Sequence, residues 1–209
     1  ANQSAGSART LGQLREIGAG SAMWSADHAA RMPPAWDNTD GRNRSYAQVL
    51  DPYVHGVESY RKADSKFIGA NKRLPLRITP HSHPITFSLN RSVARDVTRY
   101  GEQQEETISM HSLHNPSEII LAIDGCQNPR NLNQANASTY ELFFAISDTG
   151  PQAGGDDLIP AGPDADAASA DGWIRYPGGK ANALMCDGSA RTVVKGSIRA
   201  RNVWRAFQD

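Results

Sequence analysis

The hydrophobic pattern at the start of the chain predicts an amphipathic helix from about Ser4 to Ala30. Small and apolar residues recur at helical spacing, namely Leu11, Leu14, Ile17 or Gly18, Ala22 and Ser25. The charged residues Arg9, Arg15 and Glu16 fall outside this seam and should face solvent. Pro33 and Pro34 should end the helix, because proline cannot continue its hydrogen-bond ladder. A helix of this length spans about 40 Å, so we expect one end to project.

Further along the chain, short apolar runs predict strands. Ile119–Ile123 and Tyr140–Ile146 are continuous runs, which suits strands covered on both faces. Ala181–Cys186 and Arg191–Val194 flank an Asp-Gly pair and should form a hairpin, and Ile85–Leu89 is a weaker candidate. A long helix followed by a late antiparallel sheet is an α+β arrangement with long loops.

Two shorter segments also read as helical. The stretch "RSYAQVLDPYVHGVESY" predicts a helix ending near Asp51-Pro52 and then a one-turn segment. "GSIRARNVWRAF" predicts a helix capped by Ser197 that buries Ile198, Val203 and Trp204.

Length, charge and hydrophobicity bear on which classes of protein the chain can belong to. The 209 residues suffice for one generous domain, and 22 basic residues balance 22 acidic ones. A protein whose main partner is nucleic acid needs a basic surplus, so we expect no nucleic-acid partner. No run approaches the roughly 20 apolar residues that cross a bilayer. The chain also lacks an initiator Met, which suggests that a segment has been removed ahead of Ala1.

Three stretches together resemble a known family. They are "ARTLGQLREIGAGSAMWSADHAARMPPA", "NPSEIILAIDG" and "RYPGGKANALMCDGSARTV". They are similar to the type IV pilin-like proteins, in particular the bacterial prepilin-like proteins with a C-terminal His…Asp-Gly motif, which are related to the pseudopilins of type II secretion. The signature residues that match in register are Arg175, Gly178, Gly179, Ala181, Asn182, Leu184, Asp187 and Gly188. Tyr176 and Ser189 stand where the signature has histidines.

The resemblance implies a fold, a location and a function. Residues 1–32 would be the exposed half of the pilin helix, and residues 33–209 the globular head. A leader cut by a prepilin peptidase and an apolar half-helix, anchored in the inner membrane, would precede Ala1. The protein would then be a non-enzymatic subunit of a type II secretion or type IV pilus-type filament, periplasmic or on the cell surface. Its partners would be other subunits, through the helix, and the assembly machinery.

The aspartates could either form turns or bind a metal ion. Asp124-Gly125 and Asp187-Gly188 suit tight turns, since glycine accepts positive φ and aspartate bonds nearby backbone amides. The alternative is a Ca²⁺ site, which needs six to eight oxygen ligands. The loop after Ile146 supplies carboxylates, namely Asp148, Asp156, Asp157, Asp164, Asp166 and Asp171. Major pseudopilins of type II secretion commonly bind Ca²⁺ in such a loop, and Asp156 and Asp157 are the candidate ligands here.

Other candidates for chemistry are weaker. His81 with His83, and His111 with His114, have spacings seen in zinc sites, but solvated loop histidines are the simpler interpretation. Cys126 and Cys186 could pair or stay as buried thiols.

No nucleophile motif is present, so we expect no catalysis and no resident cofactor. The alternative from another class is a secreted carbohydrate- or metal-binding module. In that case the sugar platforms would be Trp24, Trp36, Trp173 and Trp204.

Overall fold

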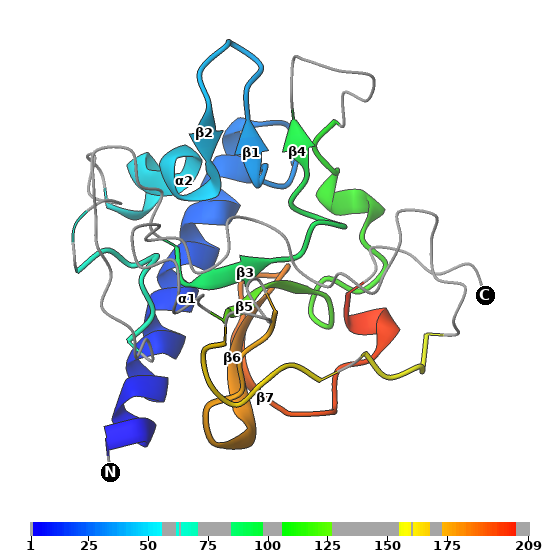
Figure 1. The fold of residues 1–209 in the computed structure, drawn as a ribbon. Coiled ribbons are helices and arrows are strands. Elements are labelled where there is room, and N and C mark those ends of the chain that lie inside the picture. Colours follow the sequence, from blue (N-terminus) through cyan, green and yellow to red (C-terminus); the bar gives the residue numbers. More distant parts are fainter. Residues whose placement is uncertain are drawn as a thin grey trace.

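The computed structural model describes residues 2–55, 62, 64–70, 85–97, 106–126, 155–159, 161–167 and 173–203. Within these ranges the fold is α+β, with an N-terminal helix against a four-stranded, antiparallel sheet. Figure 1 shows the helix running along one side of the sheet, with its N-terminal turns at the lower left of the molecule. The predicted class is confirmed. The predicted strand at 140–146 and Trp204 lie outside the described residues.

The long helix α1 spans Asn2–Asp27. Leu14 and Ile17 are buried on its inner face, whereas Arg9, Arg15 and Glu16 are exposed as expected. Met23, with 56% of its surface exposed, faces solvent on the opposite side. Among the described residues, no helix is both long and apolar enough to cross a membrane.

The helix ends earlier than the sequence predicted, six residues ahead of Pro33. Ala29 and Ala30 adopt left-handed conformations with φ of 53° and 57°. The N–H of Ala30 bonds to the carbonyl of Ser25 at 2.9 Å, which closes the final turn. The chain then pairs with residues 108–110, where the N–H of Met32 bonds to Ile108 at 2.7 Å. The helix therefore stops at a tertiary contact, and the prolines follow it.

The main sheet has the strand order β3-β5-β6-β7. Its strands are Phe87–Leu89 (β3), Ile120–Asp124 (β5), Lys180–Met185 (β6) and Ala190–Val194 (β7). The hairpin of β6 and β7 was predicted within one residue, and so was the apolar run of β5. All five residues of β5 are buried, which explains why its sequence does not alternate.

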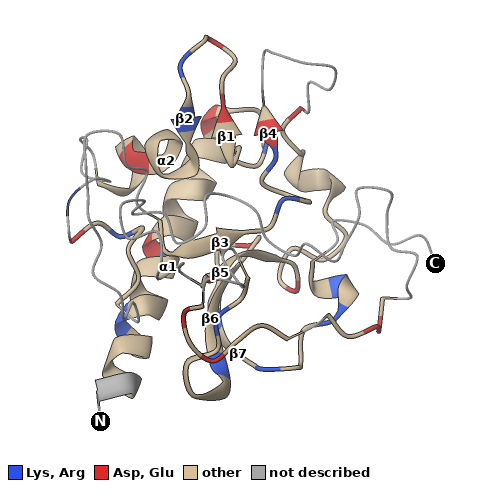
Figure 2. Cartoon of the chain, viewed as in Figure 1, with Lys and Arg blue, Asp and Glu red and all other residues tan. Residues whose placement is uncertain are grey.

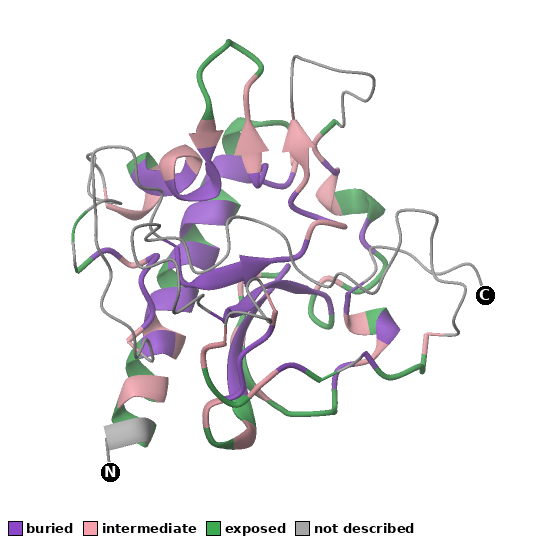
Figure 3. Ribbon diagram, in the orientation of Figure 1, coloured by how far each residue is buried: buried purple, intermediate pink, exposed green. Residues whose placement is uncertain are grey.

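Each face of the sheet has its own core. The larger cluster, under α1, includes Leu14, Phe87, Leu121 and Leu184. The smaller cluster packs on the other face and includes Ile123, Ile174, Tyr176, Met185 and Val203. In Figure 3 the central strands and the inner side of α1 are purple, while outer turns are green.

A second helix and a small sheet complete the upper part of Figure 1. Helix α2, Tyr46–Val54, packs on α1, and Pro52 lies inside it. The predicted end at Asp51-Pro52 is therefore wrong by two residues. Pro52 falls in the last turn, where its missing N–H interrupts only the end of the ladder. The small sheet joins three two-residue strands in the order β2-β1-β4: Trp36–Asp37 (β1), Arg44–Ser45 (β2) and Asp96–Val97 (β4).

In the described part of the chain, three short 3-10 turns lie in the connections: η1 at Met110–Ser112, η3 at Pro177–Gly179 and η4 at Ala200–Asn202. The predicted C-terminal helix is reduced to η4 in the described part of the chain. Its cap is not Ser197, whose hydroxyl bonds to the carbonyl of Val194 at 2.7 Å. Instead Asn202 accepts the N–H of Arg199 at 2.9 Å. Ile198 and Val203 are buried as expected.

Candidate functional site

Two of the candidate residues, Asp124 and Asn182, meet at a buried junction between β5 and β6. Oδ2 of Asp124 accepts hydrogen bonds from the backbone N–H of Asn182 at 2.8 Å and from its side-chain amide at 2.9 Å. Both residues are 2% exposed. In a regular sheet a backbone carbonyl would accept the N–H of Asn182. Here the Asp124 carboxylate takes the place of that carbonyl.

The same junction reaches the long helix. Oδ1 of Asn182 accepts from the hydroxyl of Ser7 at 2.8 Å and from that of Thr192 at 3.2 Å. One amide therefore connects α1, β5, β6 and β7. The sequence indicated Asp124 and Asn182, but not Ser7, because a serine on a helix carries no signal of its distant partner.

Asp124 also marks the point where the neighbour of β5 changes. Beyond it, Gly125 pairs with Ile174, and the N–H of Arg175 bonds to the carbonyl of Asp124 at 2.9 Å. The chain stays extended through Gly125, so the predicted turn at Asp124-Gly125 is wrong. A buried carboxylate that bonds across to the next strand replaces it.

Arg175 forms a buried ion pair at this place. Its Nη1 lies 3.0 Å from Oδ2 of Asp166, and the two side chains are only 3% and 5% exposed. The pair joins the segment before β6 to the loop at 161–167. Breaking a buried pair of this kind by removing one partner costs roughly 3–5 kcal/mol, so its role is structural.

Gly178 and Gly179 turn the chain from this segment into β6. Their φ values are 64° and 76°, a region that side chains disfavour. The carbonyl of Gly179 accepts the N–H of Lys195 at 2.9 Å, which extends the β6–β7 pairing. These two positions need glycine for backbone reasons.

Tyr176, at the place of the signature histidine, is 1% exposed and belongs to the smaller core. Burial raises the pKa of its hydroxyl to about 12. A neutral phenol held inside the core acts as a packing group and is not suited to the proton transfer or metal binding that an imidazole could perform.

The second Asp-Gly pair is a true turn. Gly188 has a φ of 85°, and its N–H bonds to the carbonyl of Met185 at 3.0 Å. Oδ1 of Asp187 accepts from the N–H and hydroxyl of Ser189 at 2.9 and 2.7 Å. Helix α1 packs closely against this turn at Gly18. A Cβ added to Gly18 would lie only 2.7 Å from the carbonyl oxygen of Gly188.

Three of the described acidic residues of the long loop, Asp156, Asp164 and Asp166, form ion pairs with basic side chains. Asp156 lies 2.8 Å from Arg201, and Asp164 lies 3.0 Å from Lys195. The carbonyl of Asp157 accepts the N–H of Ala200 at 2.8 Å. Among the residues that the structure describes, no three His, Cys, Asp or Glu side chains gather as a metal site. Calcium binding at Asp156 and Asp157 stays a prediction, and Asp148 and Asp171 lie outside the described ranges.

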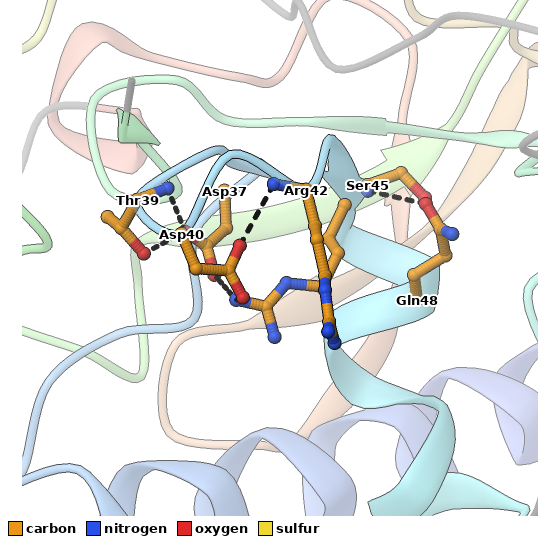
Figure 4. Close-up of polar contacts among 7 residues, drawn as sticks. Asp37, Thr39, Asp40, Arg42, Ser45 and Gln48 are labelled. Atoms are coloured by element: carbon orange, nitrogen blue, oxygen red, sulfur yellow. Dashed lines mark hydrogen bonds and ion pairs between the residues drawn. The ribbon is translucent and has the colours of Figure 1, made fainter. Parts of the chain in front are cut away.

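A further acidic loop, not indicated by the sequence analysis, joins β1 and β2. Asp37 accepts from the N–H and hydroxyl of Thr39, and Asp40 from the N–H of Arg42 at 3.0 Å (Figure 4). This backbone bond is the main reason that the pKa of Asp40 is lowered. Arg44 contacts Asp37 at 2.7 Å and Asp40 at 3.3 Å. Both carboxylates are therefore already neutralised.

Charge elsewhere is also mixed. Figure 2 shows acidic and basic positions scattered over the described elements, without a large region of one sign. His111 and His114 are exposed, while His81 and His83 lie outside the described residues. Cys126 and Cys186 are both buried, and neither forms a disulfide.

A His–Asp pair that was not predicted from the sequence lies at the C-terminal end of helix α2. Nδ1 of His55 lies 2.7 Å from Oδ1 of Asp51, and Nε2 accepts the N–H of Lys66 at 3.1 Å. The i, i+4 spacing was the available signal. Both ring nitrogens are occupied by structural bonds, so the pair fixes the loop at 64–70.

The chain was compared with protein-family models, curated proteins and solved structures, and no match was found in any of them.

Proposed function

We propose that the chain is a non-enzymatic, pilin-like subunit of a type II secretion or type IV pilus-type filament. The observation that carries this proposal is the seating of α1 on the sheet by residues of the signature itself. Gly18 lies against Gly188, and Ser7 bonds to Asn182. The resembling motif thereby gains a physical role, which is to hold a long helix against a sheet.

The outer side of α1 supplies the surface for other subunits. It is exposed along its whole described length at Ala8, Arg15, Ala19, Met23 and Ala26. Small side chains allow helices to approach closely, as a filament stem requires. In this proposal the helix continues N-terminally into an apolar half that anchors the subunit in the inner membrane before assembly. The head then lies in the periplasm or on the cell surface.

Cysteine cross-linking in the full-length protein, expressed with its own assembly genes, tests the proposal. An Ala8→Cys variant should give a ladder of cross-linked multimers, because position 8 would lie near neighbouring helices. Thr39→Cys is the matched control, since Thr39 is exposed on the β1–β2 loop at the other end of the molecule. Native Cys126 and Cys186 are buried and should not contribute. Equal ladders, or none from Ala8→Cys, would contradict the proposal.

The coding sequence upstream of Ala1 gives an independent test. We expect an apolar run of about 20 residues preceded by a short leader with a prepilin-peptidase junction. A conventional secretory leader would instead favour the secreted binding module.

A further inference from the structure

A cavity lies between the C-terminal half of α1 and the β6–β7 turn. It has a volume of about 30 Å³ and is partly open to solvent. Helix α1 contributes the small residues Gly18, Ser21 and Ser25 to its wall, and the turn contributes Cys186 and Asp187. The small side chains leave the space that a larger residue on α1 would fill.

Sulfur-bearing residues from three separate segments line this cavity. They are Met32 after α1, Met110 in η1 and Cys186 at the end of β6. Met32 and Cys186 are 2% and 5% exposed, and Met110 is half-buried. Met185 also borders the cavity, but its side chain packs in the smaller core on the other face of the sheet.

The two cysteines differ in their surroundings. Sγ of Cys126 accepts the N–H of Ala167 at 3.2 Å. Cys186 forms no disulfide, and its Sγ makes no hydrogen bond with the described residues. Burial raises the pKa of the Cys186 thiol, so without a positive ion beside it the sulfur stays protonated.

We propose that Cys186, together with Met32 and Met110, binds one copper(I) ion in this cavity. Thiolate and thioether ligands select soft ions such as Cu(I), whereas Ca²⁺ and Mg²⁺ prefer oxygen. Binding replaces the thiol proton, which leaves to solvent, and forms a copper–sulfur bond without any change of oxidation state. One monovalent cation, one thiolate and two neutral thioethers sum to zero charge, so the apolar site holds no net charge. Asp187, which also lines the cavity and is exposed, adds a negative charge beside it.

The test is an anaerobic titration of the chain with Cu(I) buffered by bathocuproine disulfonate. We expect one ion per chain, release of one proton, and an affinity that falls as pH is lowered. Cys186→Ser should weaken binding by at least about a hundredfold, and Met32→Leu or Met110→Leu by at least about tenfold. Cys126→Ser is the matched control and should bind as the parent does. Near-UV circular dichroism of each variant checks that it is folded.

Several results would overturn the proposal. One is that the chelator retains all the copper, and another is that the folded Cys186→Ser variant binds copper as tightly as the parent. The proposal also fails if Cys126→Ser loses as much copper affinity as Cys186→Ser, or if the two methionine variants bind copper like the parent. Because binding is measured on the isolated chain, failure here leaves the filament proposal untouched, and the reverse also holds.

Discussion

Asp124 and Asp187 are each followed by glycine, yet only Asp187 stands at a turn. Asp124 is buried and accepts two bonds from Asn182, whereas Asp187 is exposed and bonds within its own turn. The dipeptide alone gives both the same local preference. The difference arises because the neighbouring strand presents the N–H and the side-chain amide of Asn182 to Asp124.

The two aspartates should therefore differ in their contribution to stability. Asp124→Ala leaves the N–H and the side-chain amide of Asn182 without an acceptor, and we expect a loss of roughly 3 kcal/mol in the free energy of unfolding. Asp187→Ala, at an exposed turn, should cost no more than about 1 kcal/mol. Urea unfolding of both variants measures this, and similar losses would contradict the assignment of Asp124 to a buried network.

Ala29 and Ala30 carry strain that glycine would relieve. A left-handed conformation costs a non-glycine residue about 1–2 kcal/mol. Ala30→Gly should therefore raise the free energy of unfolding by about 1 kcal/mol, although glycine also makes the unfolded chain more flexible. Ala26→Gly, in the exposed part of α1, should lower it by about 1 kcal/mol. If both substitutions destabilise equally by urea unfolding, the left-handed end of the helix is not where we place it.

At the level of secondary-structure elements, the hydrophobic pattern of α1 predicts only some of the contacts that hold this helix in place. The spacing of Leu11, Leu14 and Ile17 predicts which side faces inward, because apolar side chains avoid water. Leu14 and Ile17 are buried accordingly, and Leu11 is half-buried. Which glycine is essential could not be predicted, since that depends on what lies opposite.

Gly18 and Gly12 give a matched pair on this helix. A methyl group on Gly18 would lie 2.7 Å from the Gly188 oxygen and 2.9 Å from Cδ1 of Leu184, while Gly12 has open space. Gly12→Ala should stabilise by about 1 kcal/mol through helix propensity. Gly18→Ala should instead destabilise by about 1–3 kcal/mol, because the helix must move off the turn. Thermal melting of both variants measures whether the two stability changes have opposite signs. A stabilised Gly18→Ala variant would show that Gly18 does not pack against the Gly188 turn.

At the scale of the whole molecule, the sheet separates two cores that each contain a buried tyrosine. Tyr46 lies in the larger core and Tyr176 in the smaller one. Burial raises both pKa values, that of Tyr176 to about 12. The folded state therefore keeps these protons at a pH where the unfolded chain has released them.

Stability should fall with rising alkalinity for this reason. The contribution of Tyr176 is fully present below pH 10 and is lost as the pH rises from about 10 to about 12, at roughly 1.4 kcal/mol per pH unit. Tyr176→Phe removes this contribution, so its free energy of unfolding should fall less steeply than that of the parent. Urea unfolding at several pH values between 9 and 12 measures the difference. Parallel curves would mean that the Tyr176 hydroxyl reaches solvent.

Several local elements of this protein could be predicted from the sequence alone. The periodicity of α1, the apolar run of β5 and the β6–β7 hairpin each depend on neighbours within a few residues, so they could be read from the chain. Only the tertiary structure decided where α1 ends, that Asp124 serves a neighbouring strand, that Gly18 meets Gly188, and that Met32, Met110 and Cys186 line one cavity. These features join residues up to 170 positions apart, as Gly18 and Gly188 are, and no local preference encodes such a meeting. It follows from packing a helix on a sheet, which the chain achieves only as a whole.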